Sequence, residues 1–313
     1  MADVLRAAPT PRRRRLTRSR KEALWFYLFI SPWVVGFLAF LAGPIAASAY
    51  LSLTTYDIIH PPSFLGFQNY SDLFTDDLFW QSLKVTTIYS LFSVPLGIAL
   101  ALGVAVMLNQ KIPFVALFRT IYYLPSVISG VAVSLLWLWM FNPSFGLLNS
   151  ILWQVFHIRG PGWIYSEQWV LPSLILMSLW TVGGSIVLYL AGLQGVPTEL
   201  YEAASLDGAG AWRRFWHVTL PMISPVILFT LITGIIASFQ TFTQAQIMTQ
   251  GGPHYGSWFY IYNLWYNAFG SSGADMGYAS AIAWILFILV LGLTLLALRT
   301  SQAWVYYEGA ERR

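Results

Sequence analysis

Six long apolar stretches without a single Asp, Glu, Lys or Arg restrict what this chain can fold into. They cover about residues 23–50, 85–108, 121–141, 169–193, 222–248 and 278–298. Each reaches the roughly 20 residues that a helix needs to cross a bilayer. A soluble core could bury one such stretch but not six, and only 10% of the residues are charged, against about 25% in globular domains. The sequence therefore predicts an all-α integral membrane protein with six transmembrane helices.

The distribution of Lys and Arg predicts the orientation of these helices, because cytoplasmic loops carry an excess of both residues. An even number of spans places both termini on one side. That side would hold 15 of the 17 basic residues, and only Lys84 and Arg159 would lie on the other. The 15 are Arg6, Arg12, Arg13, Arg14, Arg15, Arg18, Arg20, Lys21, Lys111, Arg119, Arg213, Arg214, Arg299, Arg312 and Arg313. We expect both termini to be cytoplasmic.

The apolar stretches also define the domain organisation. A six-span domain, residues 23–299, lies between two cytoplasmic tails, residues 1–22 and 300–313. The first tail is rich in Arg, and attraction to anionic lipid explains this cluster better than binding to nucleic acid. The outer connections, residues 55–81, 142–168 and 250–277, are rich in Pro, Gly, Asp and aromatic residues. We expect short interfacial helices there.

Several kinds of chemistry are missing from the chain. All 13 acidic residues and all four histidines lie outside the apolar stretches, whereas ion-coupled carriers usually place ionisable groups at membrane depth. The three lysines are followed by Glu22, Val85 and Ile112, so no Walker A motif is present. The sequence shows no metal-ligand spacing, no Cys and no catalytic cluster at depth. We therefore expect no enzyme activity, metal or cofactor in this chain, and any ATPase must be a separate polypeptide.

The long cytoplasmic connection between spans four and five, residues 195–221, predicts a helical hairpin. Pro197 suits a first helical turn, and acidic residues follow it where the helix dipole favours negative charge. Asp207-Gly208 is a turn pair in which Gly208 can adopt positive φ. We expect a second short helix over 211–218 that stops before Pro221. Such a hairpin could dock on a partner or lie on the bilayer surface.

Glu202-Ala203-Ala204, three residues, Gly208, nine residues, Val218, one residue and Leu220-Pro221 resemble the EAA signature of ABC importer permeases. In that family the loop docks in a cleft of the ATP-binding subunit and couples nucleotide-driven closure to the membrane helices. The resemblance therefore implies a role in ATPase coupling for a defined set of residues. These are Glu202, Ala203, Ala204, Asp207, Gly208, Leu220 and Pro221.

Further stretches resemble the carbohydrate-importer permeases of the maltose and glycerol-phosphate type. They include Phe67-Gln-Asn-Tyr70, Ala191-Gly-Leu-Gln194 and Gly251-Gly-Pro253. The resemblance implies a location in the bacterial inner membrane and a second, similar permease chain as partner. It also implies two copies of an ATP-binding subunit, which would hold ATP and Mg, and an extracytoplasmic solute-binding protein.

A path for solute requires polar or aromatic groups at mid-membrane depth. In span five, Thr230, Gly234, Ser238 and Thr241 recur on one helical face, with a second polar strip beside them. Neutral hydroxyls and amides near an aromatic ring suit an uncharged sugar or polyol. The candidate path residues are Trp180, Gly184, Gly234, Ser238, Gln240 and Thr241. The competing interpretation is close helix packing, which small residues on membrane helices usually mark.

Three alternatives to a sugar importer remain open at this point. A secondary carrier acting alone would transport solute in an ion gradient without nucleotide. An ABC permease for an amino acid, peptide or oxyanion would share the architecture but not the solute. A membrane-embedded enzyme would need a polar catalytic cluster that the sequence does not show.

Overall fold

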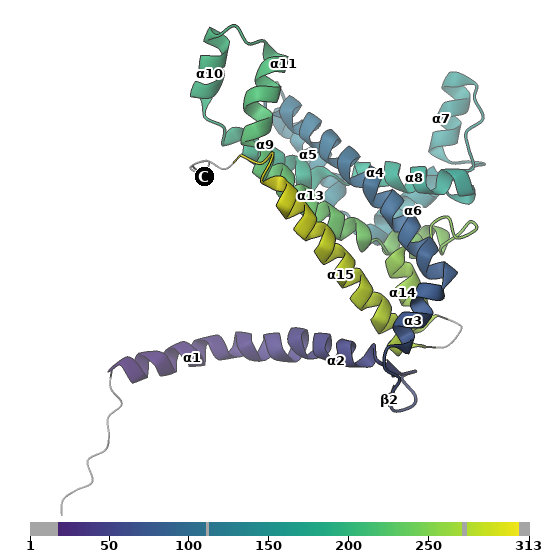
Figure 1. Ribbon diagram of the computed structural model, residues 1–313. Coiled ribbons are helices and arrows are strands. Elements are labelled where there is room, and N and C mark those ends of the chain that lie inside the picture. Colours follow the sequence, from purple (N-terminus) through teal and green to yellow (C-terminus); the bar gives the residue numbers. More distant parts are fainter. Residues whose placement is uncertain (1–17, 111–112, 271–273, 307–313) are drawn as a thin grey trace, which may run out of the picture. The chain divides into compact units, whose positions relative to one another are not determined.

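The computed structural model describes residues 18–110, 113–270 and 274–306 (Figure 1). The chain divides into two compact units, residues 1–50 and residues 51–313. The arginine-rich start of the chain, Lys111 and the last two arginines lie outside the described residues. The prediction of an all-α membrane protein is confirmed, since most of the described chain is helical and its strands form one two-stranded sheet of two residues each.

The first unit is a single long helix over its described part. It consists of α1 (Arg18–Phe37), a π-helical turn η1 (Leu38–Ala42) and α2 (Gly43–Leu51). The 33-residue helical segment Ser19–Leu51 is long and apolar enough to cross a membrane, and none of its most apolar 18 residues is buried. The widened turn precedes Pro44, whose nitrogen has no hydrogen to donate to the preceding turn.

The second unit contains both further long helices and three bent helix pairs. The long helices are α4 (Asp77–Leu108) and α15 (Met276–Ser301). The bent pairs are α5 (Val115–Val127) with α6 (Gly130–Met140), α8 (Glu167–Trp180) with α9 (Gly183–Gln194), and the helix Ala211–Met222 with α13 (Ser224–Phe239). The pairs bend by 100°, 48° and 66°. Counting each pair as one crossing gives the six that the sequence predicts.

Short elements connect these helices. The predicted short helices between spans are present as α3 (Gln68–Thr75), α7 (Leu147–Phe156) and α14 (Tyr260–Phe269). The remaining short elements are the antiparallel strands β1 (Thr54–Thr55) and β2 (Ser63–Phe64), the 3-10 turn η2 (Trp163–Tyr165) and the π-helical turn η4 (Ala245–Thr249). The sheet is absent from the sequence interpretation, because two residues per strand are too few to show an alternating pattern.

Three predicted spans differ in detail from the observed helices. The stretch 222–248 is not one helix: α13 ends at Phe239, and its last turn tightens because Gln240 N–H donates to the Ala237 carbonyl at 3.2 Å. The stretches 121–141 and 169–193 are broken, at residues 128–129 and 181–182. The first break coincides with Ser129, whose hydroxyl caps α6, and the second precedes Gly183-Gly184. Ser and Gly are common at such kinks.

The second unit is organised around α4, which packs against α8, α9, α13 and α14. One apolar cluster gathers around α8 and α14, a second joins the C-terminal part of α4 to α9 and the start of α13, and a third joins α3, α14 and α15. The hairpin of α10 (Thr198–Leu206) and α11 (Ala211–Arg214) lies at one end of this bundle, and β2 and α3 lie at the other (Figure 1). The first two clusters leave a cavity between them, described below.

Candidate functional site

The first arm of the hairpin is α10 (Thr198–Leu206), and its end confirms the predicted turn. Gly208 has φ +78°. Its N–H donates to the Ser205 carbonyl at 3.0 Å, and Ala209 N–H donates to the Ala204 carbonyl at 2.9 Å. This pair of bonds is a Schellman motif, which needs a left-handed residue at the position of Gly208. The tip of the hairpin is therefore set by backbone geometry rather than by packing.

The second arm is continuous from Ala211 to Met222 and comprises α11 (Ala211–Arg214), η3 (Phe215–Thr219) and α12 (Leu220–Met222). The prediction that this helix stops before Pro221 is wrong. The physical reason is the π-helical turn η3, which widens the helix just before the proline ring and leaves room for a residue without an N–H. The break falls instead at Ile223, where the chain bends by 66° into α13.

Side chains fix the two arms to each other. The hydroxyl of Tyr201 hydrogen-bonds that of Thr219 at 3.0 Å. Arg214 Nη1 donates to Ser205 Oγ at 2.9 Å, and this hydroxyl donates in turn to the Tyr201 carbonyl at 2.6 Å. The hairpin is thus braced near its base and in its middle, so it can move as a rigid body.

The structure divides the predicted coupling residues into two groups. Glu202, Ala203, Asp207 and Gly208 are exposed at the tip, Ala204 is partly exposed, and the neighbouring Leu206 is 90% exposed. Leu220 and Pro221 lie at the base, where Leu220 packs against the cluster around α9 and Ile223. The tip is therefore available to a partner, and the base connects it to α13.

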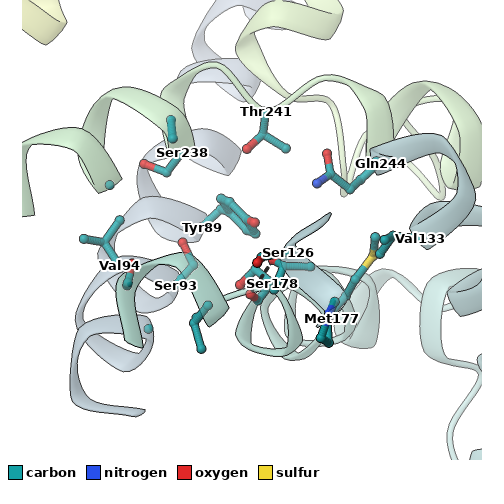
Figure 2. Close-up of a pocket in the computed structure, with 18 of the residues that line it drawn as sticks. Tyr89, Ser93, Val94, Ser126, Val133, Met177, Ser178, Ser238, Thr241 and Gln244 are labelled. Atoms are coloured by element: carbon teal, nitrogen blue, oxygen red, sulfur yellow. Dashed lines mark hydrogen bonds between the residues drawn. The ribbon is translucent and has the colours of Figure 1, made fainter. Parts of the chain in front are cut away.

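A cavity of about 440 Å³ lies inside the bundle. It is bounded by α4, by the α5–α6 break, by the α8–α9 break and by the C-terminal part of α13. Its walls include Tyr89, Val133 and Met177 of one apolar cluster and Val182 of the next. Figure 2 shows serine, threonine and glutamine side chains gathered around Tyr89. No lining residue is Asp, Glu, Lys, Arg or His.

Three of the six predicted path residues line this cavity, namely Gly234, Ser238 and Thr241. The other three are not in its lining. Trp180 packs edge-on against the Trp137 ring, with centroids 6.0 Å apart. Gly184 and Gln240 are exposed, because the chain turns at 181–182 and after Phe239.

The polar stripe on α13 serves both packing and the cavity. Thr230, at one end, hydrogen-bonds the buried hydroxyl of Tyr189 and holds α13 against α9. Ser238 donates to Ser90 on α4 at 2.7 Å while also lining the cavity. Helix packing therefore accounts for Thr230, whereas the interpretation as a solute path still applies to Ser238 and Thr241.

The sequence interpretation missed the cavity residues on α4, α5 and α8. They include Tyr89 and Ser93 on α4, Ser126 on α5 and Ser178 on α8. The hydroxyl of Tyr89 interacts with Ser93, Ser178 and Thr241. The aromatic ring at the cavity is thus that of Tyr89 rather than Trp180. The spacing of Tyr89 and Ser93, four residues apart on one helical face, is the signal that could have indicated them.

The hydroxyl groups of the cavity are oriented by the backbone. Ser126 Oγ donates to the Tyr123 carbonyl and Ser178 Oγ to the Ile175 carbonyl, both at 2.7 Å. Their protons are thereby used within the chain, so the oxygen lone pairs are left to face the cavity. A solute with several hydroxyl donors matches such a lining. Within the described residues no group of three His, Cys, Asp or Glu could hold a metal ion.

Gly183 fixes the shape of this cavity, and its replacement tests that role. A Cβ at Gly183 would lie 2.5 Å from the Tyr122 carbonyl oxygen and 3.0 Å from Tyr123 Cα. We expect Gly183→Ala to push α5 from α9 and to lower stability by about 1–3 kcal/mol. The matched control is Gly184→Ala, where a Cβ meets no atom within 4 Å. Thermal unfolding of both purified variants checks this, and equal stability would contradict it.

Comparison with known proteins adds independent findings. The family model described as "Binding-protein-dependent transport system inner membrane component" matches residues 93–303, which include the hairpin and every residue of the cavity lining except Tyr89. The probable ABC transporter permease protein YesP of Bacillus subtilis (strain 168) is 42% identical, covering 93% of this chain and 95% of that protein. The lactose transport system permease protein LacF of Rhizobium radiobacter is 36% identical, covering 95% and 99%.

A solved bacterial alginate ABC transporter, in complex with alginate pentasaccharide-bound periplasmic protein, contains a chain of the same fold. Its TM-score to this chain is 0.80 with 24% identity, covering 92% of this chain and 98% of that one. At this level of identity the likeness concerns the fold alone.

Proposed function

Because this chain belongs to the family of binding-protein-dependent transport system inner membrane components and is therefore a permease subunit, we propose that its solute is a sugar or related polyol. The observation that carries this proposal is the cavity between α4, α8 and α13, which combines a tyrosine ring with oriented hydroxyls and contains no Asp, Glu, Lys, Arg or His in its lining. The similar protein LacF is named for lactose transport, which agrees with a neutral, hydroxyl-rich solute.

ATP hydrolysis, in this proposal, takes place in a separate partner chain. Two copies of an ATP-binding subunit hold ATP and Mg, and each docks on a hairpin tip such as the one around Glu202 and Gly208. A second, similar permease contributes the other hairpin and the other half of the path. The exposed Leu206 and Trp212, 90% and 74% accessible, give the tip an apolar surface for such a contact.

The orientation proposed from the sequence is supported by where the described basic residues lie. Arg213 and Arg214 are on the second arm of the hairpin, Arg299 lies in the last turn of α15, and Arg119 donates to the Leu108 carbonyl at the end of α4. Lys84 lies in the N-terminal part of α4, and Arg159 lies in the connection between α7 and η2. We propose that the hairpin and both termini face the cytoplasm of a bacterial cell, and that the solute-binding protein docks on the opposite face.

Transport then follows from the connection between tip and cavity. Closure of the two ATPase subunits draws the hairpins together, and each hairpin moves as a rigid body because its arms are braced. The movement enters α13 through the bend at Ile223 and reaches Ser238 and Thr241 at the cavity. We propose that closure opens the cavity towards the binding protein and that resetting the ATPase opens it towards the cytoplasm.

Reconstitution tests the proposed function. The permease pair and ATPase subunits in liposomes should take up radiolabelled sugar only when ATP is inside and the solute-binding protein is outside. An ion gradient without nucleotide should give no uptake. Uptake by this chain alone in such a gradient would contradict the proposal in favour of a secondary carrier. Selective uptake of an amino acid, peptide or oxyanion would contradict the choice of a sugar but not the architecture.

A further inference from the structure

An exposed apolar knob stands at the end of the bundle opposite the α10–α11 hairpin. It consists of Ile58, Ile59, Phe64, Leu65 and Phe67, on and beside the turn between β1 and β2. Ile59, Phe64 and Phe67 are 84%, 72% and 76% exposed. Side chains of this size and exposure on a rigid turn mark a surface that another molecule covers.

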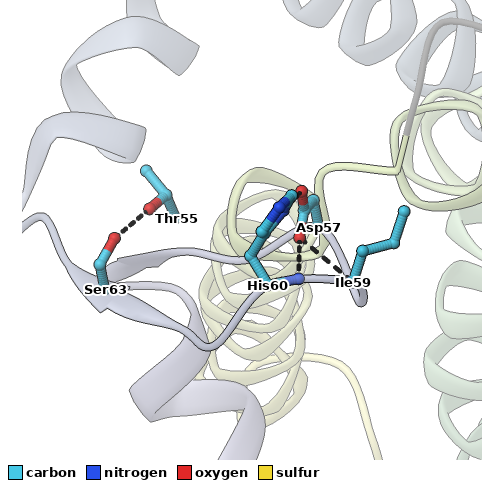
Figure 3. A network of polar contacts seen from close by, with 5 residues as sticks. All are labelled: Thr55, Asp57, Ile59, His60 and Ser63. Carbon is cyan, nitrogen blue, oxygen red and sulfur yellow. Dashed lines mark hydrogen bonds and ion pairs between the residues drawn. The ribbon is translucent and has the colours of Figure 1, made fainter.

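The turn that presents the knob is rigid. The Asp57 carboxylate accepts hydrogen bonds from the N–H groups of Ile59 and His60 at 3.1 and 2.7 Å, and it pairs with the His60 ring at 2.6 Å (Figure 3). The hydrogen bond from the His60 ring is the main reason that the pKa of Asp57 is lowered from its ordinary value. The hydroxyls of Thr55 and Ser63 bond across the strands at 2.6 Å.

Residues of α3 and α15 hold the base of the turn. Asn69 Nδ2, which is buried, donates to the carbonyls of Ser52 and Thr54, both at 2.9 Å. Met276 N–H, at the start of α15, donates to the Tyr56 carbonyl at 2.8 Å. The apolar side chains are therefore held out from the bundle by a braced scaffold, and a partner that binds them has little ordering entropy to overcome.

The charges around the knob decide which partner it fits. The stretch from residue 57 to residue 77, which contains the knob, carries four aspartates: Asp57, Asp72, Asp76 and Asp77. The chain contains no Lys or Arg between residues 22 and 83. Asp72 and Asp77 are exposed. An anionic bilayer surface would repel this acidic border, so insertion into lipid is disfavoured. A protein whose apolar groove is bordered by Lys or Arg would be attracted to it.

We propose that this knob is a docking element for the solute-binding protein, and that it enters an apolar groove bordered by basic side chains on one lobe of that protein. This inference rests on the proposed function, since it assigns a surface to a partner that the family requires. The apolar side chains of the knob supply the affinity of this contact. The aspartates set the orientation and speed of docking, because charges at the edge of an interface act mainly on association.

A pair of double variants tests the apolar part. In nanodiscs with the partner permease and ATPase, Ile59→Ser with Phe64→Ser should raise by about tenfold or more the binding-protein concentration that half-maximally stimulates ATPase activity. The matched control, Ile59→Val with Phe64→Leu, stays apolar and should remain within about twofold of wild type. Basal ATPase activity should be unchanged in both. An unchanged half-maximal concentration in the serine variant would overturn the inference.

A fluorescent label tests the identity of the partner. The chain has no Cys, so Ile59→Cys can carry a single environment-sensitive dye. Its emission should shift to the blue only when binding protein is added, and less so as salt rises from about 50 to about 500 mM. The same dye on Leu206→Cys, in sealed liposomes with binding protein outside, should not respond. A blue shift already present in lipid, or on assembly with the partner permease, would overturn the inference.

ATPase stimulation of the wild-type complex distinguishes a failure of the proposed function from a failure of the docking inference. If binding protein fails to stimulate wild-type ATPase activity, the proposed function is at fault. If stimulation is normal and the serine variant matches wild type, only the role of the knob is wrong.

Discussion

Replacing Gly208 by Asp is expected to abolish uptake while leaving the chain inserted in the membrane. A Cβ at this position would meet no atom of the chain within 4 Å, so the bulk of the new side chain points into open space, where we propose that the ATPase docks. The left-handed φ of +78° adds strain of about 1 kcal/mol, which Asp tolerates better than most residues. The loss should therefore arise at the docking surface rather than from unfolding.

Two neighbouring substitutions separate charge and bulk from backbone strain. Gly208→Asn keeps the side-chain shape and the tolerance of positive φ but carries no charge. Gly210→Asp adds the same charge two residues on, at φ −66°, where a Cβ also meets no atom. Co-purification of the ATPase subunit and sugar uptake are measured for all three. Normal co-purification and uptake by the Gly208→Asp variant would contradict the docking role of the tip.

The hairpin was largely open to prediction from sequence because local rules determine it. A helix that ends in Asp-Gly adopts a left-handed turn whatever its surroundings, and Gly208 does so. The prediction that the second arm stops before Pro221 is wrong because the local rule that proline ends a helix does not hold where a π-helical turn precedes the proline. That turn is stabilised by tertiary packing around Phe215 and Val218, which no local pattern reveals.

The cavity was only partly predictable for a related reason. Helical periodicity places Gly234, Ser238 and Thr241 on one face of the predicted fifth span, and the structure brings all three to the cavity although α13 ends before Thr241. The residues opposite them depend on how sharply the two broken spans bend, by 100° and 48°. Those angles follow from close backbone contacts such as Gly183 with the Tyr122 carbonyl, so single-helix patterns could not show that Tyr89 and Ser178 would face the stripe.

The predicted membrane orientation depends on where Lys and Arg lie along the chain. Charge counting along the sequence uses residues that the structure does not describe, among them Lys111 and the terminal arginines. The folded part nevertheless separates Arg119, Arg213 and Arg299 from Lys84 and Arg159 by whole spans. A labelling experiment on the two sides of intact cells, with single cysteines at Leu206 and Ile59, would test the proposed orientation directly.

Filling the cavity should separate solute movement from ATP hydrolysis. Thr241 lines the cavity opposite Tyr89 (Figure 2), and the indole of Thr241→Trp would project into its roughly 440 Å³. We expect uptake to fall more than about tenfold, a barrier increase above about 1.4 kcal/mol, while binding protein still stimulates the ATPase. The reason is that the hairpin tip and the knob are untouched, so the coupling machinery turns over without a passage for solute.

Two further variants decide whether the cavity is a path or only a packing defect. Thr233→Trp places the same ring on the exposed face of α13, where Thr233 bonds only within its own helix, and uptake should stay near wild type. Tyr89→Phe keeps the cavity shape but removes the hydroxyl that interacts with Ser93, Ser178 and Thr241. The loss of one hydrogen bond to a passing sugar, about 1 kcal/mol, should slow uptake several-fold. Equal uptake by Thr241→Trp and Thr233→Trp would place the solute path elsewhere in the assembly, because a blocked path cannot conduct as well as an open one.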